Sequence, residues 1–344
     1  MGGGLPQQLD TLLMKKILFL TNCQGFEYNN FLHIGSDSYA RDWECLKSIQ
    51  AQSMKASDAP FLLEQMEEAD VIVAQPLFSA PIKEIHPSAI RNWADRVGKK
   101  LISVPALQYD ALTFGTVPKL WRDVPNYPFA ANENMLIAAG YICGLSAKAT
   151  AELYHNATLL NEQQLRERVE FGILAFQKRE MEAGTDIIAS EYYAEHWRTS
   201  RLHFAKGHPL PEVMRHFAGA LAEKLGIQDF DPLRTGAIKG FFGHCMPIPR
   251  WIKNGLDLEF ETDHDTVCCD KKYISLEEFI RIMFEWYNVQ GRDEVERRVS
   301  HEMPYKRAMK AAAQLAGAPP SKIYALKSTV LGRLSHHWKK SRFR

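Results

Sequence analysis

KKILFLTN, residues 15–22, is a continuous apolar run of strand length between two lysines and an asparagine. A strand that is covered on both faces has this pattern, because neither of its sides meets water. The segments ADVIVAQP (residues 69–76) and KKLISVPA (residues 99–106) repeat the pattern, and helix-compatible sequence precedes each of them. Strands that alternate with helices in this way pair into a parallel sheet. We therefore predict an α/β fold with a small parallel sheet and flanking helices.

Helical sequence dominates after residue 145. Residues 161–184 form an amphipathic pattern that ends at Gly184, and its apolar face is Leu165, Val169, Ile173, Leu174 and Phe176. Residues 229–258 are rich in Pro and Gly, and their Phe, Trp and Ile content predicts an ordered, functional loop. The predicted division is a disordered N-terminus (1–14), an α/β subdomain (15–145), a helical, loop-and-helix subdomain (146–325) and a basic tail (326–344).

The composition excludes several classes of protein. The 344 residues are 46% hydrophobic with a formal net charge of +1, so bulk charge gives no argument for nucleic-acid binding. No apolar run approaches the roughly 20 residues that span a bilayer. The six cysteines are too sparse for a disulfide scaffold and include no C-x-x-C pair, and the histidines are scattered, so no metal site is predicted. We expect a cytoplasmic protein with reduced thiols, and leave open whether it meets the inner membrane peripherally.

Polar residues follow the predicted strands at the edge where a parallel sheet binds its ligands. Asn22, Cys23 and Gln24 follow the first strand, and Gln75 ends the second. Where a strand leads into a helix, backbone N–H groups can bind an oxyanion or a phosphate, and they lower the pKa of a nearby thiol. The alternative is a buried cysteine whose neighbouring amides cap the turn, which is the commoner outcome for a lone cysteine.

A histidine lies in the turn of LHFAKGHP, residues 202–209. His208 stands between Gly and Pro, and histidine is the natural general base near neutral pH. An ordinary loop histidine explains the pattern equally well. The cations Arg198, Arg201 and Lys206 could hold phosphate groups, or they could form a solvated basic face.

Tyr109 and Asp110 follow the third predicted strand. A polar aromatic residue beside a carboxylate suits the binding of a hydroxylated substrate. The alternative is a turn-forming Asp next to a packed Tyr.

Taken together and in this order, these pieces resemble the WcbI-like polysaccharide biosynthesis family. The features that carry the resemblance are ILFLTNCQ, ADVIVAQPL, VPALQYDAL, the stretch from EYYAEHWRTSRLHFAKGHP to LGI, and MPIPRWIKNGLDLEF. They cover residues 16–258. Thr21 departs from the pattern, because a glycine is common at that position in the family.

The resemblance implies a cradle-like fold whose loop-and-helix part holds coenzyme A. It also implies an O-acetyl transfer from acetyl-CoA to a sugar of a capsular or surface polysaccharide, in association with other biosynthesis proteins. No metal is implied.

Acyl transfer to a hydroxyl needs a base, oxyanion donors and a site for the CoA phosphates. We expect His208 to be the base and Asn22, Gln24 and nearby backbone N–H groups to be the donors. Arg198, Arg201 and Lys206 would face the phosphates, while Tyr109 and Gln75 would contact the substrate. Cys23 could carry the acyl group or lie beside the CoA thiol, and we favour the second.

Two rival functions remain. One is a carbohydrate esterase with Cys23 as nucleophile, His208 as base and Asp110 orienting the histidine. The other is a non-catalytic protein that binds CoA or sugar.

Overall fold

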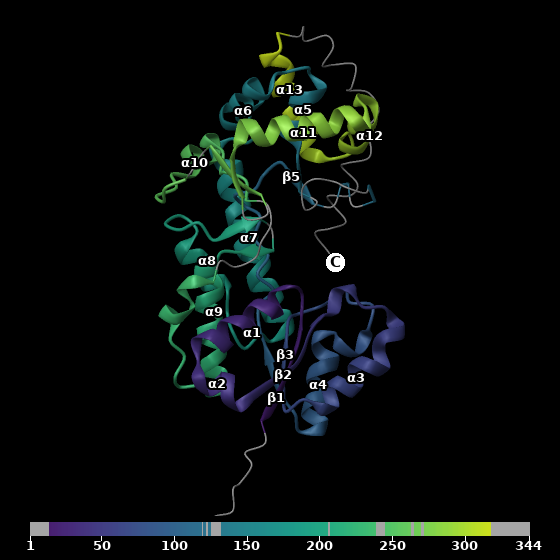
Figure 1. Ribbon diagram of the computed structural model, residues 1–344, viewed down its shortest axis with the longest axis vertical. Helices are drawn as coiled ribbons and strands as arrows, with labels where there is room; N and C mark the ends of the chain where they lie inside the picture. Colours follow the sequence, from purple (N-terminus) through teal and green to yellow (C-terminus); the bar gives the residue numbers. More distant parts are fainter. Residues whose placement is uncertain are drawn as a thin grey trace, which may run out of the picture. The chain divides into compact units, whose positions relative to one another are not determined.

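Figure 1 shows the computed structural model of the chain. The structure describes residues 14–118, 120–121, 123–124, 132–205, 207–238, 245–262, 265–269 and 272–317. Residues 1–13 of the predicted N-terminal segment, Lys206 and the basic tail at 326–344 lie outside the described residues.

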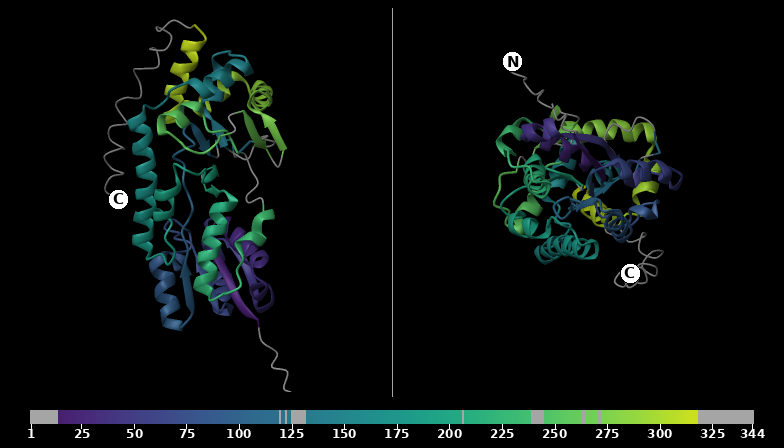
Figure 2. Two further views of the ribbon diagram at one scale, coloured as in Figure 1. Left: turned by 90° about the vertical axis from the view of Figure 1, so that its left-hand side faces the viewer. Right: turned by 90° about the horizontal axis from the view of Figure 1, so that it is seen from below.

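The chain forms two compact units, and neither is a continuous stretch of sequence. The first unit comprises residues 1–109 and 170–241, and the second comprises residues 110–169 and 242–344. These boundaries differ from the contiguous division at residue 145 expected above. Helix α7 (Glu162–Ala183) contributes to both units, and the left view of Figure 2 shows it as one long helix.

A four-stranded parallel sheet forms the centre of the first unit. Its strands are β1 (Lys15–Thr21), β2 (Trp43–Gln50), β3 (Val71–Ala74) and β4 (Lys100–Ser103), in the order β2-β1-β3-β4. The predicted α/β fold and its parallel sheet are confirmed, and β1, β3 and β4 are the three predicted strands. The edge strand β2 was not predicted. It is only partly buried, so it lacks the continuous apolar run that marks the other three.

Helices cover the two faces of this sheet (Figure 1). Leu18 of β1 and Ile72 of β3 pack in one buried cluster with Leu62 and Met66 of α3 (Ala59–Glu68) and Ile90 of α4 (Pro87–Val97). The remaining elements of the first unit are α1 (Gln24–Gly35), α2 (Asp37–Asp42), α8 (Ser190–His196), α9 (Pro211–Leu225), the hairpin strands β7 (His203–Ala205) and β8 (His208–Pro209), and the short helices η1 (Ala51–Ser53), η2 (Ala56–Asp58), η3 (Lys83–Ile85) and η4 (Pro232–Ala237).

The second unit is mainly helical. Its helices are α5 (Met135–Ile142), α6 (Ala147–Asn156), the first part of α7, α10 (Arg250–Leu256), α11 (Leu276–Gln290), α12 (Arg292–Val299) and α13 (Met303–Leu315). Two small antiparallel pairs accompany them, β5 (Thr116–Pro118) with β6 (Asn132–Asn134) and β9 (Thr266–Cys269) with β10 (Lys272–Ser275). Helix α5 is apolar on every side because α6, α11, α12 and α13 all pack against it.

Helix ends largely follow the sequence signals. Gly184 ends α7 with a φ of +59°, a conformation that glycine adopts without strain. Ser275 caps α11 by accepting a hydrogen bond from the Glu278 N–H at 3.1 Å. Leu174 departs from the predicted apolar face of α7, because its side chain is exposed.

Among the helices that the structure describes, none is long and apolar enough to cross a membrane.

Candidate functional site

The turn after β1 places Cys23 at the N-cap of α1. The Gln24 N–H donates to Asn22 Oδ1 at 2.8 Å, so the asparagine side chain fixes the first turn of the helix. Gly25 allows α1 to start close against β1, because a Cβ at this position would lie 2.1 Å from Thr21 Oγ1. The turn is therefore held by its own side chains and by a close backbone approach.

Two buried glutamines connect this turn to the neighbouring strand ends. The Asn22 N–H donates to Gln75 Oε1 at 2.8 Å, and Gln75 Nε2 donates to Gln24 Oε1 at 2.6 Å and to Pro105 O at 3.1 Å. Gln24 is fully buried and Gln75 nearly so. Buried amides of this kind are stable only when their hydrogen bonds are made. The loops after β1, β3 and β4 thus form one connected edge, as the sequence predicts for a parallel sheet.

Gln24 extends the connection to the β7–β8 hairpin. Its Nε2 donates to Leu107 O at 2.8 Å and to Gly207 O at 2.9 Å, and the Leu107 N–H donates to Gln24 Oε1 at 3.1 Å. An amide nitrogen has two protons, so both donors of Gln24 are engaged within the protein, as are both donors of Gln75. These amides hold the loops in place instead of pointing donors at a ligand. Among the described residues, Asn22 Nδ2 has no such internal acceptor.

The Cys23 thiol differs from the expectation of a lowered pKa. Burial raises its pKa, and the carboxylate of Glu27 adds to the effect. Loss of hydration disfavours the thiolate by more than the helix N-terminus favours it. Cys23 is therefore a thiol at neutral pH.

Glu27 was not predicted as a site residue. It follows Cys23 by one helical turn, burial raises the pKa of its carboxyl, and its Oε2 is buried without a hydrogen-bond partner among the described residues. The i to i+4 spacing in a predicted helix was the available sequence signal.

His208 opens strand β8, directly after the turn at Gly207. Burial lowers the pKa of its imidazole, so the ring is neutral near pH 7. The imidazole of His203 links the hairpin to helix α8. Tyr193 OH lies 2.5 Å from His203 Nε2, and His203 Nδ1 lies 3.2 Å from Ala205 O. Because a carbonyl only accepts, Nδ1 carries the proton and Nε2 accepts from the tyrosine. Ala205 pairs with His208 across the hairpin.

Tyr109 and Asp110, which were expected beside this edge, differ in their surroundings. Tyr109 is 3% exposed, and its ring packs 5.2 Å from that of Tyr193, which matches the packed-tyrosine alternative. Asp110 belongs to the second unit and lies 3.5 Å from the Arg168 guanidinium. Its predicted partnership with His208 stays a prediction.

Three cations were expected to face phosphate groups: Arg198, Arg201 and Lys206. Arg198 is exposed in the turn after α8, and Arg201 Nε donates to His203 O at 3.1 Å. Lys206 lies outside the described residues. Within the described part of the chain, no three His, Cys, Asp or Glu side chains gather as metal ligands would.

Comparison with known proteins identifies the family. None of the curated proteins compared matches the chain. A solved structure of WcbI superposes on this chain with a TM-score of 0.64 at 18% sequence identity. That structure is described as a novel polysaccharide biosynthesis enzyme, in its native form without a disulfide bond between coenzyme A and a cysteine. The match covers 87% of this chain and 99% of that one. The family model of the polysaccharide biosynthesis enzyme WcbI matches residues 16–229, which include the whole strand-end edge and the hairpin. The chain therefore belongs to the WcbI family of polysaccharide biosynthesis enzymes.

Proposed function

We propose that this protein is an O-acyltransferase that moves an acyl group, in the first instance acetyl, from coenzyme A to a sugar hydroxyl of a capsular or surface polysaccharide. The observation that carries the proposal is the bond from Gln24 Nε2 to Gly207 O at 2.9 Å. Through it, the residue after Cys23 is tied to the residue before His208. A thiol at a helix N-cap and a neutral histidine thus belong to one hydrogen-bonded edge.

In the proposed reaction, His208 accepts the proton of the sugar hydroxyl, and the hydroxyl oxygen attacks the thioester carbonyl carbon. The Asn22 amide donates to the oxyanion that forms. The C–S bond then breaks, and His208 returns the proton to the departing CoA sulfur, so atoms and charges balance. The lowered pKa of His208 suits the first step, because only the neutral imidazole accepts a proton.

Cys23 is proposed to lie beside the CoA sulfur without carrying the acyl group. A covalent route needs a thiolate, and burial raises the pKa of this thiol. The same argument disfavours an esterase with Cys23 as nucleophile. The description of the WcbI structure in terms of coenzyme A and a cysteine supports this placement.

Arg198 and Arg201 are proposed to face the CoA phosphates. Arg201 Nε donates to His203 O of this hairpin at 3.1 Å, and Arg198 is exposed in the turn that precedes the hairpin in the chain. A guanidinium binds phosphate oxygens through paired N–H groups.

Thermal-shift titration with CoA and acetyl-CoA, and with buffer alone as control, is the first test. Binding to the native state raises the melting temperature by mass action. Absence of a shift with every CoA species would contradict the proposal.

Acetyl transfer by variants then tests the roles. His208→Ala should lower kcat by about 10²- to 10⁴-fold while the CoA-induced shift stays. The exposed His33→Ala is the matched control and should be unchanged. Cys23→Ser should retain transfer, whereas its loss with intact CoA binding would favour the covalent route.

A further inference from the structure

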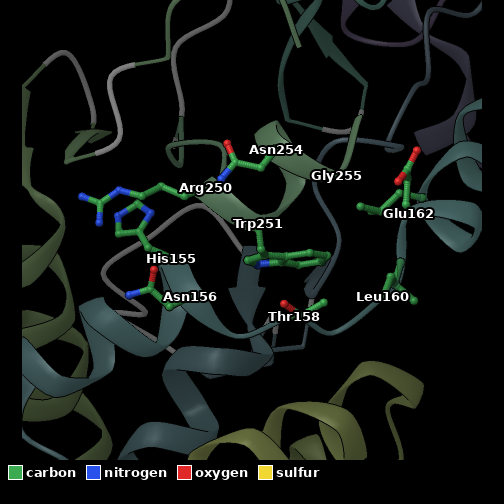
Figure 3. A pocket seen from close by; sticks show the side chains of 10 residues that line it. His155, Asn156, Thr158, Leu160, Glu162, Arg250, Trp251, Asn254 and Gly255 are labelled. Atoms are coloured by element: carbon green, nitrogen blue, oxygen red, sulfur yellow. The ribbon is translucent and has the colours of Figure 1, made fainter. Parts of the chain in front are cut away.

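The second unit contains a hollow of about 420 Å³ between the end of α6, the start of α7 and helix α10 (Figure 3). Its lining is His155, Asn156, Thr158, Leu160, Glu162, Leu165, Arg250, Trp251, Asn254 and Gly255. The volume lies within the usual range of small-molecule sites. All these residues belong to the second unit, so the hollow is complete within it.

Buried side chains form the floor of the hollow. Trp251, Leu160 and Leu165 are all less than a tenth exposed, and Figure 3 shows the Trp251 indole at the centre of the labelled side chains. The Trp251 Nε1–H is buried and has no acceptor among the described residues. A buried indole donor normally finds a partner. A ligand oxygen in the hollow would supply one.

The rim is polar and its charge is balanced. Exposed Asn156, Thr158 and Asn254 offer amide and hydroxyl groups, which both donate and accept. The rim carries one cation, Arg250, and one anion, Glu162, among its described members. The floor is largely apolar but also includes the buried His155 imidazole. Such a floor under amide and hydroxyl groups, with one cation and one anion on the rim, fits a neutral ring that bears many hydroxyls. It does not fit a phosphate, which would need a surplus of cations.

Neighbouring hollows extend this surface. Asn156 and Thr158 also line a hollow of about 690 Å³ that continues along α13 to Leu315. Thr158 lines a third hollow, of about 360 Å³, whose lining includes the cations Arg307 and Lys310. Three hollows that share one residue suit a ligand longer than a single ring.

We propose that the hollow around Trp251 binds a neutral pyranose ring of an oligosaccharide. The C–H face of the sugar lies on Trp251 and Leu160, its hydroxyls bond to Asn254 and Thr158, and further sugars follow the adjoining hollows. The proposal goes beyond the acyl-transfer function and does not depend on it, because it assigns a ligand to the second unit whether or not the first unit transfers an acyl group. The Pro- and Gly-rich segment at 229–258, expected from the sequence to be functional, supplies α10 to this site.

Saturation-transfer NMR on the full chain tests the proposal with glucose, galactose, mannose and a linear neutral trisaccharide of each. We expect transfer to the sugars, with the trisaccharide bound more tightly than its monomer. Asn254→Ala removes a rim amide and should weaken binding about tenfold, the equivalent of one lost hydrogen bond. Trp251→Phe keeps an aromatic floor but removes the indole N–H, and it should also weaken sugar binding. Gln163→Ala, which removes an exposed amide that does not line the hollow, is the matched control and should have no effect.

Two results would overturn the proposal. One is the absence of transfer to every sugar of the panel, and the other is sugar binding that Asn254→Ala and Trp251→Phe both leave unchanged. Inorganic phosphate, tested alongside, should not compete with the sugars, and competition would assign the hollow to an anion instead. The CoA-induced thermal shift of Asn254→Ala should equal that of the native protein, which separates failure of this proposal from failure of the acyltransferase function.

Discussion

Replacing Gln24 by Met should destabilise the first unit more than any surface change. Methionine has a similar length but no amide, so the carbonyls of Leu107 and Gly207 lose their donor and the Leu107 N–H loses its acceptor. Each buried polar group left without a partner costs about 1–3 kcal/mol. Allowing for partial relaxation and for the apolar gain of methionine, we expect the free energy of unfolding to fall by about 3–5 kcal/mol.

Urea unfolding followed by circular dichroism measures this loss, and hydrogen exchange of the β7–β8 hairpin localises it. The double variant with Gln75→Met should lose less than the sum of the single variants, because Gln75 Nε2 donates to Gln24 Oε1 at 2.6 Å. A coupling of about 0.5–3 kcal/mol is usual for residues in direct contact. Gln163→Met replaces an exposed glutamine on α7 and should stay within about 0.5 kcal/mol of the native protein.

A loss below about 1 kcal/mol for Gln24→Met, the value of one ordinary hydrogen bond, would refute the reasoning that this amide holds the strand-end loops together. Unchanged hydrogen exchange at the β7–β8 hairpin in Gln24→Met would refute the proposed link between Gln24 and the hairpin that carries His208.

Three further results are expected. Gly25→Ala should destabilise the protein by about 1–3 kcal/mol in urea unfolding despite the better helix propensity of alanine, because the new Cβ would lie 2.1 Å from Thr21 Oγ1; equal or higher stability would show that the contact relaxes freely. Alkylation of Cys23, followed by peptide mass spectrometry, should need a higher pH than alkylation of a free cysteine. Glu27→Gln should speed the reaction at fixed pH by removing the charge that helps raise the thiol pKa. A slower reaction in this variant would contradict the assigned cause. The contribution of His208 to stability should be complete above its ordinary pKa of about 6.5 and should be lost as the pH falls through its lowered folded-state pKa. In His208→Ala, the free energy of unfolding should therefore depend less on pH below about pH 6.5.

Much of the architecture follows from sequence alone. The runs at residues 15–22, 69–76 and 99–106 predict buried parallel strands because a strand covered on both faces must be apolar throughout. Glycine at 184 and the serine at 275 predict helix ends, since each has a local backbone reason to be there. Strand β2 escapes this reasoning because an edge strand with one exposed side has no continuous apolar run.

The sequence by itself determined the α/β sheet and the edge at which Asn22, Cys23 and Gln24 gather, since both depend on local pattern and on a general property of parallel sheets. Only the tertiary structure decided what these residues can do. Gln24 donates both of its amide protons to the carbonyls of Leu107 and Gly207, which are distant in sequence. Burial by the surrounding chain raises the pKa of Cys23, although the helix N-terminus acts locally to lower it. Hydrogen-bond partners and hydration are set by which segments fold together, and no local pattern of residues contains that information.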